Sequence, residues 1–202
     1  VDAMDQQLQQ ALSGRIWVVK DFELEKMASF ATANQVLAVF ERKEAVIPAS
    51  VKAELTLVLD DIRDPGNLGT MVRIADWFGI RRVWCGVGSV DVYNPKAVQA
   101  SMGGLFRVSV ATVDLASVLA QQRTRGVAIY QASMEGHSVF EVQLARQAVL
   151  VMGSESHGLS EAVRSVAGET IAIPRYGEAE SLNVATATSA LCMEFARQRR
   201  RK

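Results

Sequence analysis

Residues 150–187 contain the side chains and turns most suited to chemistry. Two short apolar runs, at 148–152 and 171–173, are typical of buried strands, and each is followed by a residue that ends strands. Behind the second run, Ser181-Leu182-Asn183 opens a segment whose apolar residues have the spacing of one helix face. Backbone groups are free where strands end and a helix begins, so this pattern indicates a site for a small molecule. Two ordinary strand-to-helix turns would give the same spacing and are the alternative.

A second candidate segment follows the apolar run at 55–62, which ends with two aspartates and predicts a strand buried on both faces. Residues 63–66 have turn chemistry, and Asn67 is predicted to cap a helix that ends at Gly79. Arg73 falls on this helix within two turns of the strand end. A surface ion pair with Asp76 is the alternative to a functional role for this arginine.

The rest of the chain supplies the elements that must position these residues. Further strands are expected at 82–87, 105–110 and 127–132, and further helices at 94–101, 114–122 and behind 181–183. Six strands that alternate with helices predict an α/β fold with a parallel sheet. The glycines at 86 and 88 do not form a dinucleotide fingerprint, because Asp91 stands where the third glycine is required.

The first 50 residues form a separate unit in this interpretation. Helices are predicted at 5–12 and 21–29 and strands at 15–19 and 35–40, followed by a linker at 42–52 that mixes charges with a proline. The predicted domains are therefore 1–50 and 51–202.

Composition excludes several classes of protein. The chain has 202 residues, of which 49% are hydrophobic, enough for a full core, and its formal net charge is zero. No apolar run is long enough to cross a bilayer and no signal peptide precedes the first charges, so we expect a cytoplasmic protein. Cys85 and Cys192 lie too far apart for a zinc motif, and we expect buried thiols and no metal site.

Three segments resemble the ordered motifs of the SpoU-type, or TrmH-family, RNA ribose 2'-O-methyltransferases of the SPOUT superfamily. The segments read NLGTMVR at 67–73, MGSESHGL at 152–159, and IP at 173–174 followed by ESLNV at 180–184. One such motif is weak, but three in this order at matching spacing are highly specific. The resemblance covers about residues 55–198. Residues 15–40 resemble the end of the ribosomal-protein-like RNA-binding domain that many members carry.

This resemblance implies a parallel-sheet SPOUT fold with a C-terminal trefoil knot, an exception to the rarity of knots in proteins. A small partial α/β RNA-binding unit would precede it. The cofactor implied is S-adenosyl-L-methionine, bound in the knot cleft by the backbone of Gly153, Ile173 and Leu182, with Met152, Pro174 and Val184 beside them. The partners implied are RNA and a second copy of the chain, in a homodimer that packs through the knot region.

The resemblance also assigns catalytic positions, namely Arg73, Asn67, Glu155, Ser181 and Asn183. A guanidinium stays protonated at ordinary pH, so Arg73 is expected mainly to bind the target phosphate and stabilise the developing alkoxide. General-base action by Arg73, which would require an unusually perturbed site, is the alternative. Helix caps and turns are the alternative for the other four positions. The predicted reaction is methyl transfer to a ribose 2'-hydroxyl of ribosomal RNA. A tRNA 2'-O-methyltransferase, or a noncatalytic RNA-binding factor that keeps the fold, are the alternative functions.

Overall fold

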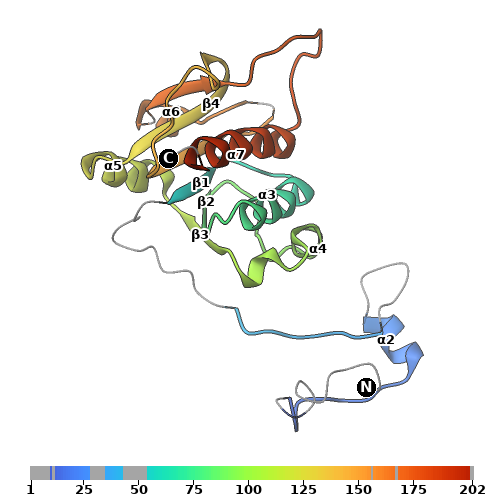
Figure 1. The fold of residues 1–202 in the computed structure, drawn as a ribbon. Coiled ribbons are helices and arrows are strands. Elements are labelled where there is room, and N and C mark those ends of the chain that lie inside the picture. The colour runs from blue at the N-terminus through green and yellow to red at the C-terminus, as the bar shows by residue number, and fades with distance from the viewer. Residues whose placement is uncertain are drawn as a thin grey trace. The chain divides into compact units, whose positions relative to one another are not determined.

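The computed structural model describes residues 10, 12–27, 35–42, 54–155, 157–166 and 168–200 of the chain (Figure 1). The chain divides into two units, residues 1–43 and residues 44–202. Each unit is described by itself below.

In the first unit, helix α2 (Asp21–Met27) agrees with the helix predicted at 21–29, of which 28–29 lie outside the described residues. Most of the helix predicted at 5–12 also lies outside them. The strands predicted at 15–19 and 35–40 are wrong, because residues 16–20 and 36–40 have no regular secondary structure. Most of their apolar side chains stay exposed, Trp17 to 80%, whereas Ile16 is partly buried. A β pattern forms a strand only where a neighbouring strand satisfies its backbone groups.

The second unit is built on one six-stranded sheet, and the predicted α/β fold with parallel strands is confirmed. The strands are β1 (Leu55–Leu59), β2 (Arg82–Gly86), β3 (Ser109–Val113), β4 (Ala128–Ser138), β5 (Ala148–Met152) and β6 (Glu169–Ala172). Their order is β3-β2-β1-β5-β4-β6, and all neighbours run parallel. Every residue of the central strands β1 and β5 is buried, as their continuous apolar runs predict.

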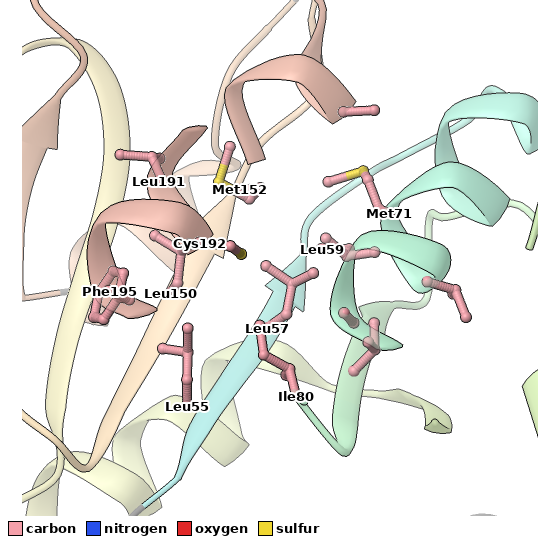
Figure 2. Packing of buried hydrophobic residues seen from close by; sticks show 14 of the residues in the cluster. Leu55, Leu57, Leu59, Met71, Ile80, Leu150, Met152, Leu191, Cys192 and Phe195 are labelled. Atoms are coloured by element: carbon pink, nitrogen blue, oxygen red, sulfur yellow. The ribbon is translucent and has the colours of Figure 1, made fainter. Parts of the chain in front are cut away.

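Helices cover both faces of this sheet. They are α3 (Pro65–Trp77), α4 (Pro95–Ser101), the 3-10 turn η1 (Gly104–Phe106), α5 (Leu115–Thr124), α6 (Glu161–Val166) and α7 (Val184–Arg200). On one face α7 packs against α3, and its Leu191, Cys192 and Phe195 lie over Leu57 and Leu150 of the central strands (Figure 2). On the other face, Val58, Val149 and Val151 pack with residues of α5 and α6. This alternation along β1 and β5 is the two-residue period of a strand.

Several predicted boundaries differ from the structure. Helix α3 begins at Pro65 and is capped by Asp64, which accepts a hydrogen bond from the N–H of Asn67 at 2.7 Å, so the prediction that Asn67 caps this helix is wrong. Strand β1 ends at Leu59 rather than at 62, because the chain turns at Asp61 with φ of 55°. The strand predicted at 105–110 begins only at Ser109, since Gly104–Phe106 form the 3-10 turn.

Close helix packing explains the glycine in the middle of α3. A Cβ built on Gly69 would lie 2.2 Å from the carbonyl oxygen of Ala97 and 2.7 Å from the Cβ of Ala100, both in α4. Only a glycine allows α4 to approach α3 at this point. The contact fixes α3, whose first turn contains Asn67.

Cys85 and Cys192 are buried free thiols, as predicted. Burial raises the pKa of each thiol to about 12, because the charged thiolate would lose its hydration.

Within the described ranges, no helix is both long enough and apolar enough to span a bilayer.

Candidate functional site

A hollow of about 220 Å³ lies where the C-terminal ends of β1 and β5 meet the N-termini of α3 and α7. The two strands are neighbours in the sheet, with Leu59 opposite Met152. In open parallel sheets, ligands bind outside the carboxyl ends of strands, so the hollow is in the expected place. Its lining residues are Asp61, Ile62, Arg63, Asp64, Asn67, Ser154, Glu155 and Val184.

The carboxylate of Glu155 joins the three sequence motifs at this hollow. Its Oε1 accepts hydrogen bonds from Nδ2 of Asn67 at 3.3 Å, from Nδ2 of Asn183 at 2.7 Å and from the N–H of Val184 at 3.1 Å. The side chain of Asn183 also donates to Oδ1 of Asn67 at 3.0 Å. We call these three side chains, Asn67, Glu155 and Asn183, the Asn-Glu-Asn network. A negative charge at the N-terminus of α7 is favourable, because the free N–H groups there carry a partial positive charge.

Asn183 has a second function as the N-cap of α7. Its Oδ1 accepts hydrogen bonds from the N–H groups of Ala185 at 3.0 Å and Thr186 at 3.2 Å. Its amide nitrogen is therefore free to point toward Glu155 while its oxygen serves the helix. The helix start predicted behind 181–183 is confirmed, and the cap explains why an asparagine stands there.

The loop after β5 forms one wall of the hollow and is tightly folded. Ser154 and Gly158 exchange two backbone hydrogen bonds, of 2.9 and 3.0 Å. A Cβ on Gly153 would lie 2.3 Å from the carbonyl carbon of Gly158, so this position requires a glycine. The buried carboxylate of Asp60 accepts a hydrogen bond from the N–H of Ser160 at 2.7 Å and ties the loop to the end of β1.

The segment between β6 and α7, residues 173–183, is the extended connection drawn in orange in Figure 1. Ile173 and Pro174 are partly buried, whereas Ser181 is exposed and Leu182 is 49% exposed. Among the described residues, no hydrogen bond uses a backbone N–H of residues 175–183. Backbone donors are thus available along this segment, as a site made from main-chain groups requires.

Arg73 stands apart from the Asn-Glu-Asn network within one chain. It is exposed and makes no hydrogen bond or ion pair with the described residues. Six residues of helix place it about 9 Å further along the α3 axis than Asn67 and on a different face. A Cβ built on Gly104 would lie 3.6 Å from the Cα of Arg73, so its backbone is beside η1. The alternative pair with Asp76 is wrong, because Asp76 binds Arg107 at 2.8 Å.

The structure therefore brings together some of the predicted site residues. Asn67, Glu155, Asn183 and Val184 are in direct contact, and Met152 and Gly153 lead into the same loop. Sequence reasoning placed Asp60, Asp61, Arg63 and Asp64 at a strand end and a turn but gave them no functional role. The available signal was the group of charged residues directly after a buried strand.

The lining of the hollow is rich in carboxylates, namely those of Asp61, Asp64 and Glu155, with Arg63 as the cation among the lining residues. Asp64 and Glu155 accept hydrogen bonds from backbone N–H groups at the starts of α3 and α7, and Asp61 pairs with Arg63. In the described part of the chain, no group of three or more His, Cys, Asp or Glu side chains could hold a metal ion. The hollow is thus a polar cleft with three carboxylates and one guanidinium in its lining.

Comparison with known proteins connects this geometry to a family. The model of the SpoU rRNA Methylase family matches residues 54–193. The chain is 32% identical over 161 residues to the 23S rRNA (guanosine(2553)-2'-O)-methyltransferase RlmP of Bacillus subtilis, a match over 79% of this chain and 64% of that enzyme. The chain thus spans less than two thirds of the length of this relative.

Solved structures of related proteins have the same fold. A TrmH-family protein from Porphyromonas gingivalis superposes with a TM-score of 0.78 at 39% identity, covering 90% of this chain and 73% of that one. The SpoU methyltransferase AviRb from Streptomyces viridochromogenes, solved in complex with the cofactor AdoMet, gives a TM-score of 0.70 at 31% identity. That match covers 76% of this chain and 63% of AviRb.

Proposed function

The chain belongs to the SpoU rRNA methylase family, and from this premise we propose that it transfers a methyl group from S-adenosyl-L-methionine to a ribose 2'-hydroxyl of ribosomal RNA. The observation that carries the proposal is the single carboxylate oxygen of Glu155. It accepts hydrogen bonds from side chains or backbone of both other motifs, at Asn67, Asn183 and Val184. The relatives named above include an rRNA 2'-O-methyltransferase and a protein solved with AdoMet, which supports the choice of reaction and donor.

The residues at the hollow fit the cofactor chemically. S-adenosyl-L-methionine carries a sulfonium and an ammonium group, and the carboxylates that line the hollow suit such positive charges. When bound, it supplies an electrophilic methyl group. Backbone groups of Gly153, Ile173 and Leu182 would hold the nucleoside part, with Met152, Pro174 and Val184 beside it. The N–H group of Leu182, which has no hydrogen-bond partner in the part of the chain that the structure describes, supports this assignment.

In this proposal the Asn-Glu-Asn network holds the cofactor-binding and ribose-binding groups in place. By fixing the N-termini of α3 and α7 against the loop after β5, it aligns the groups that bind the cofactor with those that meet the ribose. Alignment of this kind contributes up to about 7–11 kcal/mol to the lowering of a bimolecular barrier. Ser181 precedes the network in the same segment and would fix its approach to α7.

Arg73 is assigned to the RNA rather than to the cofactor. Its guanidinium is exposed on α3, so it would bind the phosphate next to the target ribose and stabilise the negative charge on the attacking oxygen. A lysine at this position would keep the charge but lose the planar two-point contact with phosphate.

We include the trefoil knot and the homodimer in the proposal. Strand β6 lies at the edge of the sheet beside β4, whereas α7 packs over the central strands, so residues 173–183 must carry the chain back across the sheet. Met193 of α7 is 62% exposed and Trp77 of α3 is 84% exposed, which supports a partner that covers these two packed helices. Ala185 and Leu191 face the core of this chain and are not available to that partner.

The first unit is proposed to add RNA contacts. Lys20 lies just before α2 and Lys26 lies within it, and their ammonium groups are 6.0 and 5.5 Å from the ring centroid of Phe22 in the same helix. All three side chains are exposed. Cations beside an exposed aromatic ring suit phosphates and unstacked bases of RNA. The division into domains at 1–50 and 51–202 stays a prediction.

Incubation with labelled S-adenosyl-L-methionine and ribosomal RNA tests the proposed function. The RNA comes from cells that lack this protein, and mass spectrometry locates any methylated ribose. We expect one modified 2'-oxygen with the wild-type chain, a loss of at least 100-fold in rate with Arg73→Ala, as expected when a group that stabilises developing charge is removed, and incomplete recovery with Arg73→Lys. Binding of RNA without methylation by the folded wild-type chain would favour the noncatalytic alternative. A near-normal rate with Arg73→Lys would contradict the role given to Arg73.

A further inference from the structure

Arg63 is held at the rim of the hollow by a two-point ion pair with Asp61. Its Nε donates to Oδ1 of Asp61 at 3.1 Å, and its Nη2 lies 3.0 Å from Oδ2. The side chain of Arg63 remains 75% exposed, and its Nη1 has no partner among the described residues. The pair therefore fixes the plane of the guanidinium and leaves a donor edge free to bind another group.

The backbone that carries this pair is in an unusual conformation. Asp61 has φ of 55°, one of two positive values at non-glycine residues in the described ranges. An aspartate tolerates this region but does not prefer it, and such positions occur often at functional sites. The strained residue is the one whose carboxylate orients Arg63.

Neighbouring loops hold this conformation in place. The N–H of Ile62 donates to Oγ of Ser89 at 3.1 Å, that hydroxyl donates to the carbonyl of Leu59, and the N–H of Val90 donates to the carbonyl of Ile62. A Cβ on Gly88 would lie 2.6 Å from Oδ1 of Asp61, so the turn after β2 leaves room for this carboxylate only because residue 88 is a glycine. The orientation of Arg63 is thus set by the fold before any ligand binds.

Arg63 is surrounded by carboxylates in the lining of the hollow. Asp64 caps α3, and Glu155 is in the Asn-Glu-Asn network, so both carboxylates face the same hollow as Arg63. An RNA strand that approaches them meets negative charge, and Arg63 is the cation among the lining residues. A guanidinium with a free donor edge is well suited to a phosphate.

We propose that Arg63 binds a backbone phosphate of the RNA strand beside the target ribose and so positions the substrate, with Asp61 orienting its guanidinium. This inference rests on the proposed function and adds a positioning residue outside the catalytic and cofactor-binding positions assigned above. It makes Arg63 a contact of the RNA rather than of the methyl donor.

Steady-state methylation and RNA binding at several salt concentrations test the inference. For Arg63→Ala we expect a roughly tenfold higher KM for RNA, a kcat within about twofold of wild type, and an unchanged Kd for S-adenosyl-L-methionine. Loss of one phosphate contact lowers the slope of log K against log salt by about 0.7 for single-stranded RNA. Arg63→Lys should keep the slope and show an intermediate KM. Gly88→Ala, which displaces Asp61 without altering Arg63, should raise KM in the same direction.

Arg107→Ala is the matched control. Arg107 forms the same two-point pair with Asp76, at 3.0 and 2.8 Å, but does not line the hollow. Equal changes in Arg107→Ala and Arg63→Ala, a wild-type salt slope in Arg63→Ala, or a weakened Kd for the methyl donor would each overturn the inference. If the wild-type chain binds RNA but methylates none, the proposed function fails, while the difference in salt slope still decides the role of Arg63.

Discussion

Asn183 donates a hydrogen bond to Glu155 over 2.7 Å and thereby connects the first residue before α7 to the loop after β5. The same carboxylate oxygen accepts from Asn67, in the first turn of α3. Two helices that begin 119 residues apart, at 65 and 184, therefore have their N-termini fixed by one side chain. This arrangement makes Glu155 a structural residue as well as a candidate for catalysis.

Replacement of Glu155 separates its charge from its hydrogen bonds. Glu155→Gln keeps an oxygen acceptor but loses the favourable charge at α7, and we expect a loss of about 0.3–1 kcal/mol in the free energy of unfolding. Glu155→Ala loses the acceptor as well and should cost about 0.5–2 kcal/mol, the range for removal of a helix cap. Urea unfolding followed by circular dichroism measures both values.

Glu161→Ala is the control for this comparison. Glu161 also lies in the first turn of a helix, α6, but accepts no hydrogen bond from the described residues. Glu161→Ala should therefore lower the free energy of unfolding only by about as much as Glu155→Gln does, because it removes a charge but no hydrogen bond. Equal losses in Glu155→Ala and Glu161→Ala would mean that the network contributes nothing to stability.

The sequence predicted the sheet better than it predicted the helix ends. Central strands such as 148–152 are read correctly because burial on both faces leaves a continuous apolar run. The cap of α3 was misplaced by three residues, although the Asp64-Pro65 pair carries a signal, since proline is favoured in the first turn and aspartate before it. Helix α6 was not predicted, because six residues are too short for a clear helical period.

The sequence indicated which residues belong to the site but not how they contact one another. The resemblance named Asn67, Glu155 and Asn183, but the pattern of the sequence contains no information that one oxygen of Glu155 binds the other two, because 88 residues separate Asn67 from Glu155. The role of Asp61 was equally hidden. This residue has a positive φ, and its carboxylate lies against the turn at Gly88, which is a tertiary contact.

Native thiols should be almost unreactive. With the pKa of Cys85 and Cys192 raised to about 12 by burial, only about one thiol in ten thousand is ionised at pH 8, and the thiolate is the reactive form. We expect a coloured disulfide reagent to modify neither cysteine of the native protein within minutes and both after unfolding in urea. Rapid reaction of one equivalent without urea would contradict the burial of that thiol.

The cap of α5 should give a pH-dependent contribution to stability. The hydroxyl of Ser117 donates to Asp114 at 2.8 Å, and this bond, with that from the N–H of Ser117, lowers the pKa of the Asp114 carboxyl. A lowered pKa in the folded state stabilises the protein above the unfolded value of about 4, and this gain is lost as pH falls through the folded value. The Tm of Ser117→Ala should therefore fall further below that of wild type at pH 7 than at pH 3.

Ser165→Ala provides the control for the pH experiment. The hydroxyl of Ser165 donates to the carbonyl of Ala162, which does not titrate. Its effect on Tm should be the same at pH 3 and pH 7. A difference between wild type and Ser117→Ala that grows on acidification would refute the assigned cause of the lowered pKa.

The glycine that begins the loop after β5 gives the sharpest test of the proposed cofactor wall. In Gly153→Ala the new Cβ would lie 2.3 Å from the carbonyl carbon of Gly158 and 2.6 Å from the N–H nitrogen of Leu159, and neither backbone group moves without the whole loop. We expect a loss of about 1–3 kcal/mol in stability, typical of overpacking, and a Kd for S-adenosyl-L-methionine raised at least tenfold. Calorimetric titration of the folded variant measures the affinity.

Gly177→Ala is the control. It lies in the segment between β6 and α7, its new Cβ would meet nothing within 4 Å, and stability should be nearly unchanged. If Gly153→Ala binds the cofactor as wild type does, the wall formed by Gly153, Ser154 and Gly158 is not part of the cofactor site.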